Sequence, residues 1–460
     1  MKKIGIVIYN YPLGNQLSLI SCATSLARKG YDVHIFIDSL IYERSRADFE
    51  EENISVHAIE IEGDPRVAKS ALSKRLNAFV NNMAAERRDK KLSRSRSVLL
   101  HAGSALYWPV DALKQSLRYS FHAQALPGPS VNEIETYTKR FFPFLIEFHQ
   151  KIAGQIDEDY VCVIGVEPFG LIAATLVANA SKHATSIPVI YYSQDLLLER
   201  ECYTFESKTL KPLERICNQT CSFTIIQDKR RAKYLCDDNN LESESIICVP
   251  VSGLESAYRM KGGLLHDMCG IPREKKILLN AGSIYEWAMC FETAQAAQTW
   301  KDNFVLVLHS GREDMKNNAL VNRIRGLSES NKVYLSLKQV DWQKMAELVS
   351  SADIGLVFYN YPGPNWYEMG YASNKLVQYL QAGLPVITSD IPSLRDVVDN
   401  YQCGECAKDL DDIEYLAEKI FNDYERYRAN AFRCYENEFD FSKYFKKVVG
   451  RIKEIEVSSC

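Results

Sequence analysis

The stretch SNKLVQYLQAGLPVITSD, residues 373–390, decides the fold, because it reads as a capped helix followed through one glycine by an apolar strand. Ser373 is a good N-cap residue, and Gly383 is a natural helix terminator. Three apolar residues between them recur at helical spacing and predict one inward face. We therefore expect a helix that packs on a sheet, as in a doubly wound α/β domain.

Lys375 lies in the first turn of this predicted helix. A positive charge there interacts unfavourably with the helix dipole, which destabilises the helix by about 0.3–1 kcal/mol. The free backbone N–H groups of a helix start, together with an ammonium group, suit a bound phosphate. Asn374 and Gln378 lie four residues apart on one helix face, so a ligand at the helix start can reach both. The alternative is a surface lysine that pairs with a nearby acid such as Glu368.

Length and composition indicate a large enzyme rather than a small module. The chain has 460 residues, a hydrophobic content of 46% and a formal net charge of -4. Two or three domains are expected, and the acidic balance argues against a nucleic-acid partner.

The first apolar run reads as a strand rather than a signal peptide, and no stretch reaches the ~20 apolar residues of a membrane span. Thirteen cysteines without a secretion signal favour reduced thiols and a cytoplasmic location.

Cys403 and Cys406 form the one close cysteine pair in the sequence. No second pair of cysteines or histidines completes a zinc site, and the surroundings do not predict a thioredoxin-like redox motif. We interpret the pair as two structural thiols in a loop.

Apolar strands and helices alternate twice along the chain, which is the βαβ rhythm of a parallel sheet. The first series of predicted strands covers residues 4–9, 33–37, 55–61, 160–166, 188–192, 224–226 and 246–249. After a polar, glycine-containing stretch, the second series covers residues 276–280, 304–309, 332–335, 354–359 and 385–388. A final amphipathic helix is expected at about residues 442–455. The sequence therefore predicts an α/β protein with two doubly wound domains of unequal size.

Two segments share a short sequence echo, GIVIYNYPLGN at residues 5–15 and GLVFYNYPGPN at residues 355–365. Both run from a predicted strand into a loop at the carboxyl edge, where open α/β sheets bind ligands. The echo has two interpretations, a common structural origin or the ordinary preference of such loops for Asn, Pro and Gly. In either case we expect both loops to face ligand-binding crevices.

The whole chain resembles the GT-B-type glycosyltransferases, and most closely family 4, the retaining enzymes that use sugar nucleotides. The resemblance rests mainly on SNKLVQYLQAGLPVITSDIPSLRDVV at residues 373–398, which looks like the donor-binding helix, loop and strand of that family. Support comes from AGSIYEW at residues 281–287 and SADIGLVFY at residues 351–359. In the first half of the chain, VIYYSQDLLLE and FTIIQDKRRAKYL also look familial.

This resemblance implies a GT-B fold, in which two Rossmann-like domains face a cleft and a C-terminal helix crosses back to the first domain. The implied acceptor-binding domain covers residues 1–252, the nucleotide-sugar-binding domain residues 253–430, and the crossing helix residues 431–460. The implied activity moves a sugar from a nucleotide-diphosphate sugar to a hydroxyl of a glycan, a lipid-linked saccharide or another acceptor. Such enzymes need neither a metal nor a cofactor, because basic side chains and a helix terminus stabilise the departing diphosphate.

The resemblance also implies a donor site built mainly from the second domain. Residues at the start of the 373 helix would hold the phosphates and the sugar, and two glycine-containing loops would approach the diphosphate. The implied donor-binding residues are Gly14, Asn15, Gly282, Ser283, Lys338, Ser373, Asn374, Lys375 and Gln378. Within this set Gln378 would lie near the ribose, and Lys338 would border the base. For Gly282 a purely conformational role is the alternative.

Three residues of the first domain would form the catalytic side of the site. Gln194 occupies the place where many relatives have a histidine that touches the donor sugar. Asp195 and Glu167 follow predicted strands and are the carboxylates best placed to contact an acceptor hydroxyl. The alternatives are that Asp195 caps a helix beginning near Leu196 and that Glu167 is a solvated acid in a turn.

Three departures from family 4 bear on the function. The family usually has two glutamates separated by seven residues at the donor helix, whereas those positions hold Gly370 and Gln378 here. It also tends to place an arginine and a lysine after the glycine that corresponds to Gly282, where this chain reads IYEWAMC. The usual sugar-contacting histidine is absent. A catalytically inert GT-B subunit that binds and assists a partner glycosyltransferase is therefore the alternative function.

A long segment at residues 64–131 has no match in the resemblance. Because it suits a separate acceptor site, a sugar-nucleotide epimerase of similar fold is less favoured. It contains ERRDKKLSRSR at residues 86–96, followed by apolar and aromatic residues. One interpretation is peripheral contact with an anionic membrane at the inner membrane surface, an attraction of about 1 kcal/mol per basic residue. The other is a solvated helix face or loop.

Overall fold

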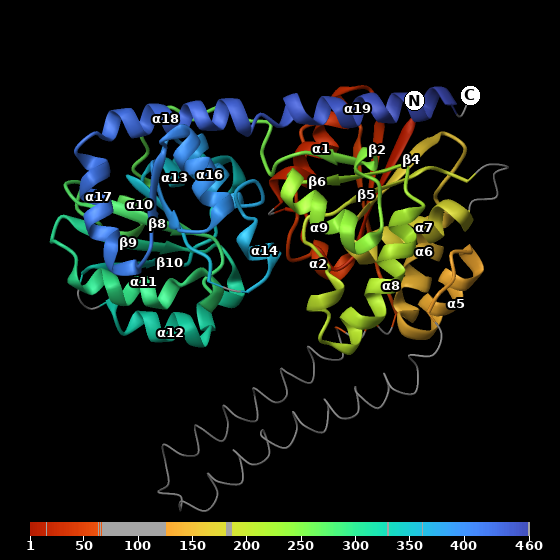
Figure 1. Ribbon diagram of the computed structural model, residues 1–460, viewed down its shortest axis with the longest axis horizontal. Coiled ribbons are helices and arrows are strands. Elements are labelled where there is room, and N and C mark those ends of the chain that lie inside the picture. Colours follow the sequence, from red (N-terminus) through yellow and green to blue (C-terminus); the bar gives the residue numbers. More distant parts are fainter. Residues whose placement is uncertain are drawn as a thin grey trace, which may run out of the picture.

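The computed structural model describes residues 1–14, 16–62, 64, 66, 126–180, 186–328, 331–360 and 362–458. Two parallel sheets lie side by side, each covered by helices (Figure 1). The first sheet contains β1 (Lys3–Ile8), β2 (Asp32–Asp38), β3 (Ile54–Ile59), β4 (Tyr160–Val166), β5 (Val189–Tyr192), β6 (Phe223–Ile226) and β7 (Ile246–Cys248). The second contains β8 (Lys276–Ala281), β9 (Phe304–His309), β10 (Val333–Ser336), β11 (Ile354–Val357), β12 (Val386–Ser389) and β13 (Gly404–Ala407).

The two sheets have corresponding strand orders. The first runs β3-β2-β1-β4-β5-β6-β7 and the second β10-β9-β8-β11-β12-β13. In each, the chain winds outward from the first strand, returns to its other side and continues in the opposite direction. The switch points, beside which doubly wound sheets bind ligands, lie between β1 and β4 and between β8 and β11.

Helices connect the strands and cover both faces of the sheets (Figure 1). In the first domain they are α1 (Leu17–Arg28), α2 (Ser39–Tyr42), α5 (Val131–Phe141), α6 (Pro143–Ala153), α7 (Glu167–Ala180), α8 (Phe205–Gln219) and α9 (Lys229–Asn239). In the second they are α10 (Leu264–Cys269), α11 (Cys290–Ala296), α12 (Ala319–Arg325), α13 (Met345–Ser350), α14 (Pro364–Tyr367), α15 (Asn374–Gln381), α16 (Pro392–Tyr401) and α17 (Ile413–Phe421).

All twelve predicted strands are present, but the sequence interpretation missed β13. The loop predicted for Cys403 and Cys406 is wrong for Cys406, which belongs to this edge strand and pairs with Thr388 of β12, whereas Cys403 lies just before the strand. Gly404 allows the close approach, since a Cβ atom there would lie 2.1 Å from the carbonyl oxygen of Val386. A glycine read as a loop signal thus marks close contact between two strands.

The sequence echo does not reflect a repeat of the two domains. It begins on β1 in the first sheet and on β11 in the second, and the strand that corresponds to β1 is β8. The common structural origin is therefore wrong, and the shared residues follow the ordinary composition of strand-to-loop exits.

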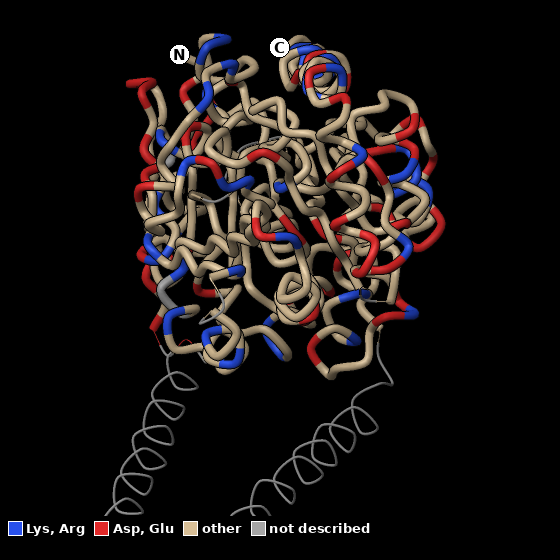
Figure 2. The backbone as a smooth tube through the Cα atoms, turned by 90° about the vertical axis from the view of Figure 1, so that its left-hand side faces the viewer, with Lys and Arg blue, Asp and Glu red and all other residues tan. Residues whose placement is uncertain are grey.

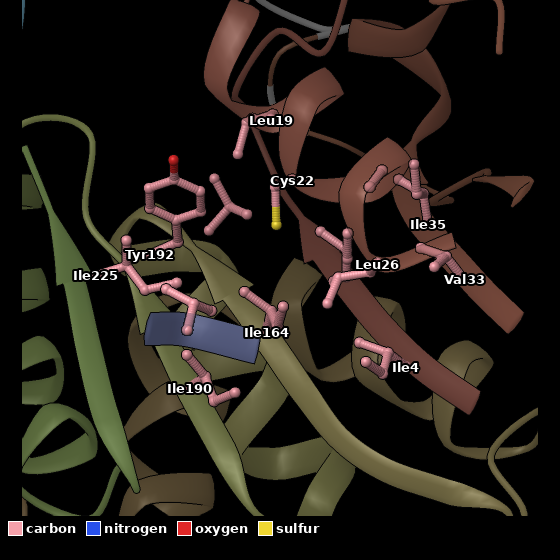
Figure 3. Close-up of a cluster of buried hydrophobic side chains, with 14 of the residues drawn as sticks. Ile4, Leu19, Cys22, Leu26, Val33, Ile35, Ile164, Ile190, Tyr192 and Ile225 are labelled. Atoms are coloured by element: carbon pink, nitrogen blue, oxygen red, sulfur yellow. The ribbon is translucent and has the colours of Figure 1, made fainter. Parts of the chain in front are cut away.

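The crossing helix predicted at the C-terminus is confirmed. Helices α18 (Tyr424–Glu438) and α19 (Phe441–Ser458) run in succession along one side of both domains (Figure 1). The buried face of α19 packs into the same core as β1, β2 and α1. Figure 3 shows part of this core, where Leu26, Ile4 and Ile164 lie together. Burial of the α19 face joins the end of the chain to its beginning.

Acidic and basic residues are interspersed along the backbone, as the colouring in Figure 2 shows. In the described part of the chain, none of the helices has the length and apolar character needed to cross a membrane. The basic stretch at residues 86–96 lies outside the described residues, so the membrane contact expected there stays a prediction.

Candidate functional site

The start of α15 is built as the sequence predicts. Ser373 is its N-cap, and the Ser373 hydroxyl accepts a hydrogen bond from the Leu376 amide at 3.2 Å. The Tyr359 hydroxyl lies 2.7 Å from the Ser373 hydroxyl, which ties the cap to the segment that follows β11. The first turn of α15 is therefore fixed beside the switch point between β8 and β11.

The side chain of Lys375 is buried, with 7% of its surface exposed. Its Nζ atom donates to Oδ1 of Asn280 at 3.2 Å and lies 5.1 Å from the ring centroid of Tyr359 and 5.7 Å from that of Trp287. Burial lowers the pKa of Lys375 to about 8. Among the described ion pairs none includes Lys375, and Glu368 instead lies 3.8 Å from Arg230. The alternative of a surface lysine paired with Glu368 is therefore wrong.

Gly282 follows β8 directly and lies against Lys375. Its φ of +131° is a backbone conformation that favours glycine, and its amide donates to the His309 carbonyl at 2.9 Å. A Cβ atom at Gly282 would lie 3.7 Å from Cγ and Cδ of Lys375. The Ala281 amide also donates to the Tyr379 hydroxyl of α15 at 2.7 Å. The loop and the helix predicted to share the diphosphate are thus in contact, and Ser283 follows as a half-buried residue.

Several buried polar atoms around this loop have no hydrogen-bond partner among the described residues. They include Oδ1 of Asn374, Nε2 of His309 and Oγ of Ser310. The other ring nitrogen of His309 bonds the Ser336 hydroxyl at 2.9 Å, and burial lowers the pKa of His309 to about 4, so the ring is neutral at pH 7. Because buried polar groups are normally paired, atoms of this kind point to a ligand or ordered water.

The remaining predicted donor residues are placed less closely together. Gln378 is half-buried on α15, and Lys338 is exposed just after β10. Gly14 donates its amide to the Ser45 carbonyl at 2.9 Å, and a Cβ atom there would lie 2.0 Å from the carbonyl oxygen of Arg46. Gly14 is therefore needed for close backbone packing, whether or not a phosphate comes near.

The first domain reaches the start of α15 through the segment after β1. Nδ2 of Asn374 lies 3.5 Å from Oε1 of Gln16, which directly precedes α1. Asn15, the neighbouring predicted donor residue, lies outside the described residues. The contact brings the carboxyl ends of β1 and the switch point of the second sheet together.

The predicted catalytic residues lie together at the carboxyl ends of β4 and β5. Glu167 begins α7 with a left-handed φ of +60°, and its Oε1 accepts from the amides of Gln194 at 2.6 Å and Asp195 at 3.0 Å. Burial and the nearby Asp195 carboxylate raise the pKa of Glu167. No described helix begins at Leu196, so the helix-capping alternative for Asp195 is wrong. The solvated-turn alternative for Glu167 is also wrong, because its carboxylate is engaged by the two amides.

Sequence reasoning missed two residues that fix this side of the site, Arg231 and Asn365. Arg231 on α9 is 1% exposed and donates from Nη2 to the Gln194 carbonyl at 2.8 Å and to Oδ1 of Asn365 at 3.0 Å. Asn365 belongs to the second domain. The sequence held a signal for each: Arg231 lies within the motif FTIIQDKRRAKYL, and Asn365 is the last residue of the sequence echo.

The fold is shared with known glycosyltransferases. HepE from Anabaena, in complex with UDP and glucose, aligns with a TM-score of 0.63 and 11% identity over 98% of this chain and 99% of that one. Sucrose-phosphate synthase from Thermosynechococcus elongatus aligns with a TM-score of 0.64 and 12% identity over 100% of both chains. WaaG, a glycosyltransferase involved in lipopolysaccharide biosynthesis, aligns with a TM-score of 0.56 and 12% identity over 98% of this chain and 99% of that one.

At the sequence level, residues 291–450 match the family described as "Glucosyltransferase 3-like, C-terminal domain". A comparison with curated protein sequences gave no match. HepE has also been solved in complex with UDP-glucose, with a TM-score of 0.61 to this chain. Together with the two corresponding sheets and the crossing C-terminal helix, these comparisons show that the chain has the GT-B fold, as its resemblance to these glycosyltransferases predicts.

Proposed function

We propose that this protein is a glycosyltransferase that moves a sugar from a nucleotide-diphosphate sugar to a hydroxyl group of its acceptor. One observation carries the proposal: Lys375 is a buried cation at the N-terminal turn of α15, and no described carboxylate pairs with it. An isolated buried charge is costly, so the site favours an anion that can neutralise it. A diphosphate placed there would also accept hydrogen bonds from the free amides of the helix start.

The same arrangement suggests how the leaving group is stabilised. As the bond between the sugar and the diphosphate breaks, negative charge grows on the phosphate oxygens. Lys375, the first turn of α15 and the exposed loop at Gly282 would stabilise that charge without large rearrangement. We infer that the reaction needs neither a metal nor a cofactor, because these groups supply the stabilisation. Retention of the anomeric configuration is part of the proposal and rests on the resemblance to family 4.

The acceptor is proposed to bind on the first domain, beside Asp195. The Asp195 side chain is exposed, whereas its backbone amide is held by Glu167. An acceptor hydroxyl could donate to this carboxylate, with Gln194 on the side of the donor sugar. We assign Glu167 to the same catalytic group, in which its carboxylate sets the position of the loop. The acceptor class is a glycan, a lipid-linked saccharide or another hydroxyl compound, as in polysaccharide or glycoconjugate biosynthesis.

The uridine diphosphate sugars are the donors to test first, because HepE binds UDP and UDP-glucose in the same fold. We propose a cytoplasmic protein, in line with its cysteine content. Peripheral contact with an anionic membrane through residues 86–96 remains part of the proposal.

A second function is favoured by one observation. The segment after Gly282 reads IYEWAMC where family 4 enzymes tend to have an arginine and a lysine, and the ring of its Trp287 lies 6.0 Å from that of Tyr359. Loss of two cations weakens the stabilisation of a departing diphosphate. A catalytically inert GT-B subunit that assists a partner glycosyltransferase would keep the fold and tolerate this change.

Thermal unfolding with a panel of nucleotide sugars separates the two functions. A nucleotide sugar at 100 times its dissociation constant stabilises a protein by ~2.7 kcal/mol, which is readily detected. The enzyme proposal predicts a shift with at least one donor, followed by donor hydrolysis or sugar transfer. The absence of a shift with every donor, together with tight association with a second glycosyltransferase, would establish the assisting subunit instead.

A further inference from the structure

The backbone of residues 194–196, which carries Gln194 and Asp195, is held almost entirely by side chains. Glu167 accepts from the amides of Gln194 and Asp195, at 2.6 and 3.0 Å. The Ser193 hydroxyl donates to the Asp195 carbonyl at 3.2 Å, and Arg231 donates to the Gln194 carbonyl at 2.8 Å. If one of these partners moved away, a backbone group of the loop would be left unpaired.

The hydrogen-bond partner of the Leu196 backbone is a side chain of the second domain, that of Asn365. Oδ1 of Asn365 accepts from the Leu196 amide at 2.7 Å, and Nδ2 of Asn365 donates to the Leu196 carbonyl at 2.7 Å. The carboxamide thus pairs with Leu196 as a neighbouring strand would. Leu196 is 5% exposed, so both backbone groups would be left unpaired and largely out of water if Asn365 moved away.

Arg231 joins the two halves of this arrangement. Its Nη2 atom donates both to the Gln194 carbonyl of the first domain and to Oδ1 of Asn365 of the second. Asp228 accepts from the Arg231 amide at 3.0 Å at the start of α9, which fixes the base of the side chain. The guanidinium group therefore links the position of the second domain directly to the loop that carries Asp195.

We propose that Asn365, with Arg231, is a positioning residue that sets the Asp195 loop only when the two domains are closed. This inference rests on the proposed function, because it assigns Asp195 to the acceptor. Asn365 lies in the same domain as α15, whose Asn374 contacts Gln16 of the first domain. A donor that draws α15 toward the first domain also brings Asn365 onto Leu196. Donor binding and the placement of the acceptor carboxylate are thereby coupled.

Amide hydrogen exchange of the full chain, resolved to single residues, tests the contact without any activity. Asn365→Ala is expected to speed exchange at the Leu196 amide by about tenfold or more, because that amide loses its acceptor. Asn365→Asp keeps an acceptor for the amide and is expected to retain most of the protection. Unchanged exchange at Leu196 in the folded Asn365→Ala variant would overturn the proposal.

Arg230→Ala is the matched control. Arg230 neighbours Arg231 on α9 and forms ion pairs with Glu368 and Asp396 of the second domain, but it is half exposed and does not bond the 194–196 backbone. It is expected to leave exchange at Leu196 unchanged. If Arg230→Ala speeds exchange there as much as Asn365→Ala does, the protection comes from general domain contact, and the specific role of Asn365 is overturned.

UDP is the probe for the coupling. In the wild-type protein UDP is expected to slow exchange at Leu196 further, and in Asn365→Ala it is expected to bind with similar affinity without this effect. With an active donor, Asn365→Ala should lower kcat at least tenfold while the donor dissociation constant changes less than threefold. UDP binding that leaves Leu196 exchange unchanged in the wild type would overturn the coupling. Failure of every donor to bind would count against the proposed function. Exchange at the Leu196 amide in Asn365→Ala without ligand would still decide whether Asn365 holds this backbone.

Discussion

The ammonium group of Lys375 lies 3.2 Å from Oδ1 of Asn280, and this amide is its hydrogen-bond partner in the described structure. Two aromatic rings supply the rest of its surroundings, those of Tyr359 and Trp287. Cation–π contacts and one neutral hydrogen bond compensate a buried charge less well than a carboxylate does. The protein thus keeps a cation that its own fold leaves incompletely compensated, which is the property expected of an anion-binding residue.

Replacement of Lys375 by methionine should separate stability from binding. Lys375→Met removes the incompletely compensated charge while it keeps the length of the side chain, so the unliganded protein is expected to gain roughly 1–3 kcal/mol at pH 7. The same variant should lose the thermal shift given by the preferred nucleotide sugar. Thermal unfolding with and without donor measures both effects. Lys446→Ala, at an exposed position on α19, is the control for charge alone. A Lys375→Met protein that still shows the full shift would remove Lys375 from the site.

Donor affinity should fall as the pH rises above about 8. The pKa of Lys375 in the unliganded protein is lowered to about 8, and a diphosphate binds the charged form and raises that pKa. Above pH 8, binding therefore requires proton uptake, and the affinity is expected to drop about tenfold per pH unit. Titration calorimetry in two buffers of different ionisation enthalpy measures the uptake. Affinity that stays constant from pH 7 to 9.5 would contradict this role.

The same pKa gives a stability prediction of definite sign. The folded-state pKa of Lys375 lies below its unfolded value of 10.5, so between pH 8 and 10.5 the unfolded chain binds more protons. The contribution of Lys375 to the free energy of unfolding therefore rises with pH in this window. Urea unfolding of the wild type and of Lys375→Met at pH 7.5 and 10 gives the free energies of unfolding whose difference isolates the contribution of Lys375. A difference between the two proteins that does not shrink at pH 10 would be inconsistent with a buried lysine.

Gly282→Ala should impair both folding and donor binding, because alanine does not readily adopt the φ of +131°. The expected loss of stability is about 1–2 kcal/mol, and the displaced loop should weaken nucleotide binding. Gly30→Ala is a matched control, since Gly30 has a φ of +91° and a methyl group added there would have nothing within 4 Å. It should lose similar stability but keep donor affinity. Equal donor affinities for the two variants would show that Gly282 serves the backbone conformation alone and has no part in nucleotide binding.

The crossing helix predicts a stability effect far from the site. Phe445 on α19 is 1% exposed and stacks on Phe441 with ring centroids 4.9 Å apart. Phe445→Ala is expected to destabilise the protein by about 3–5 kcal/mol through loss of buried contacts. Lys446→Ala, on the exposed face of the same helix, should change stability by less than about 0.5 kcal/mol. Urea unfolding of both variants measures the difference, and similar midpoints would mean that α19 does not brace the first domain.

Twelve of the described strands and the first turn of α15 were predictable because local patterns determine them. A cap at Ser373, an apolar face and Gly383 are signals within a few residues of one another. The edge strand β13 escaped prediction because its short sequence carries a glycine that is needed for contact with β12. Such contact depends on a partner strand elsewhere in the chain.

The proposed acceptor side of the site was only partly predictable for the same reason. Asp195 and Glu167 were found because both follow strands, but the bonds from Glu167 to the 194–195 amides are tertiary. Arg231 read as one of several basic residues in a helix, and Asn365 as a loop residue. Their pairing joins positions 134 residues apart and exists only when the two domains meet.

A crystal structure of the protein with a bound nucleotide diphosphate would decide whether α15 is the diphosphate site. We expect a phosphate within hydrogen-bond distance of Lys375 Nζ and of the amides at the start of α15, with Gly282 alongside. A diphosphate bound elsewhere on the protein, with Lys375 still bonded only to Asn280, would show that this assignment is wrong.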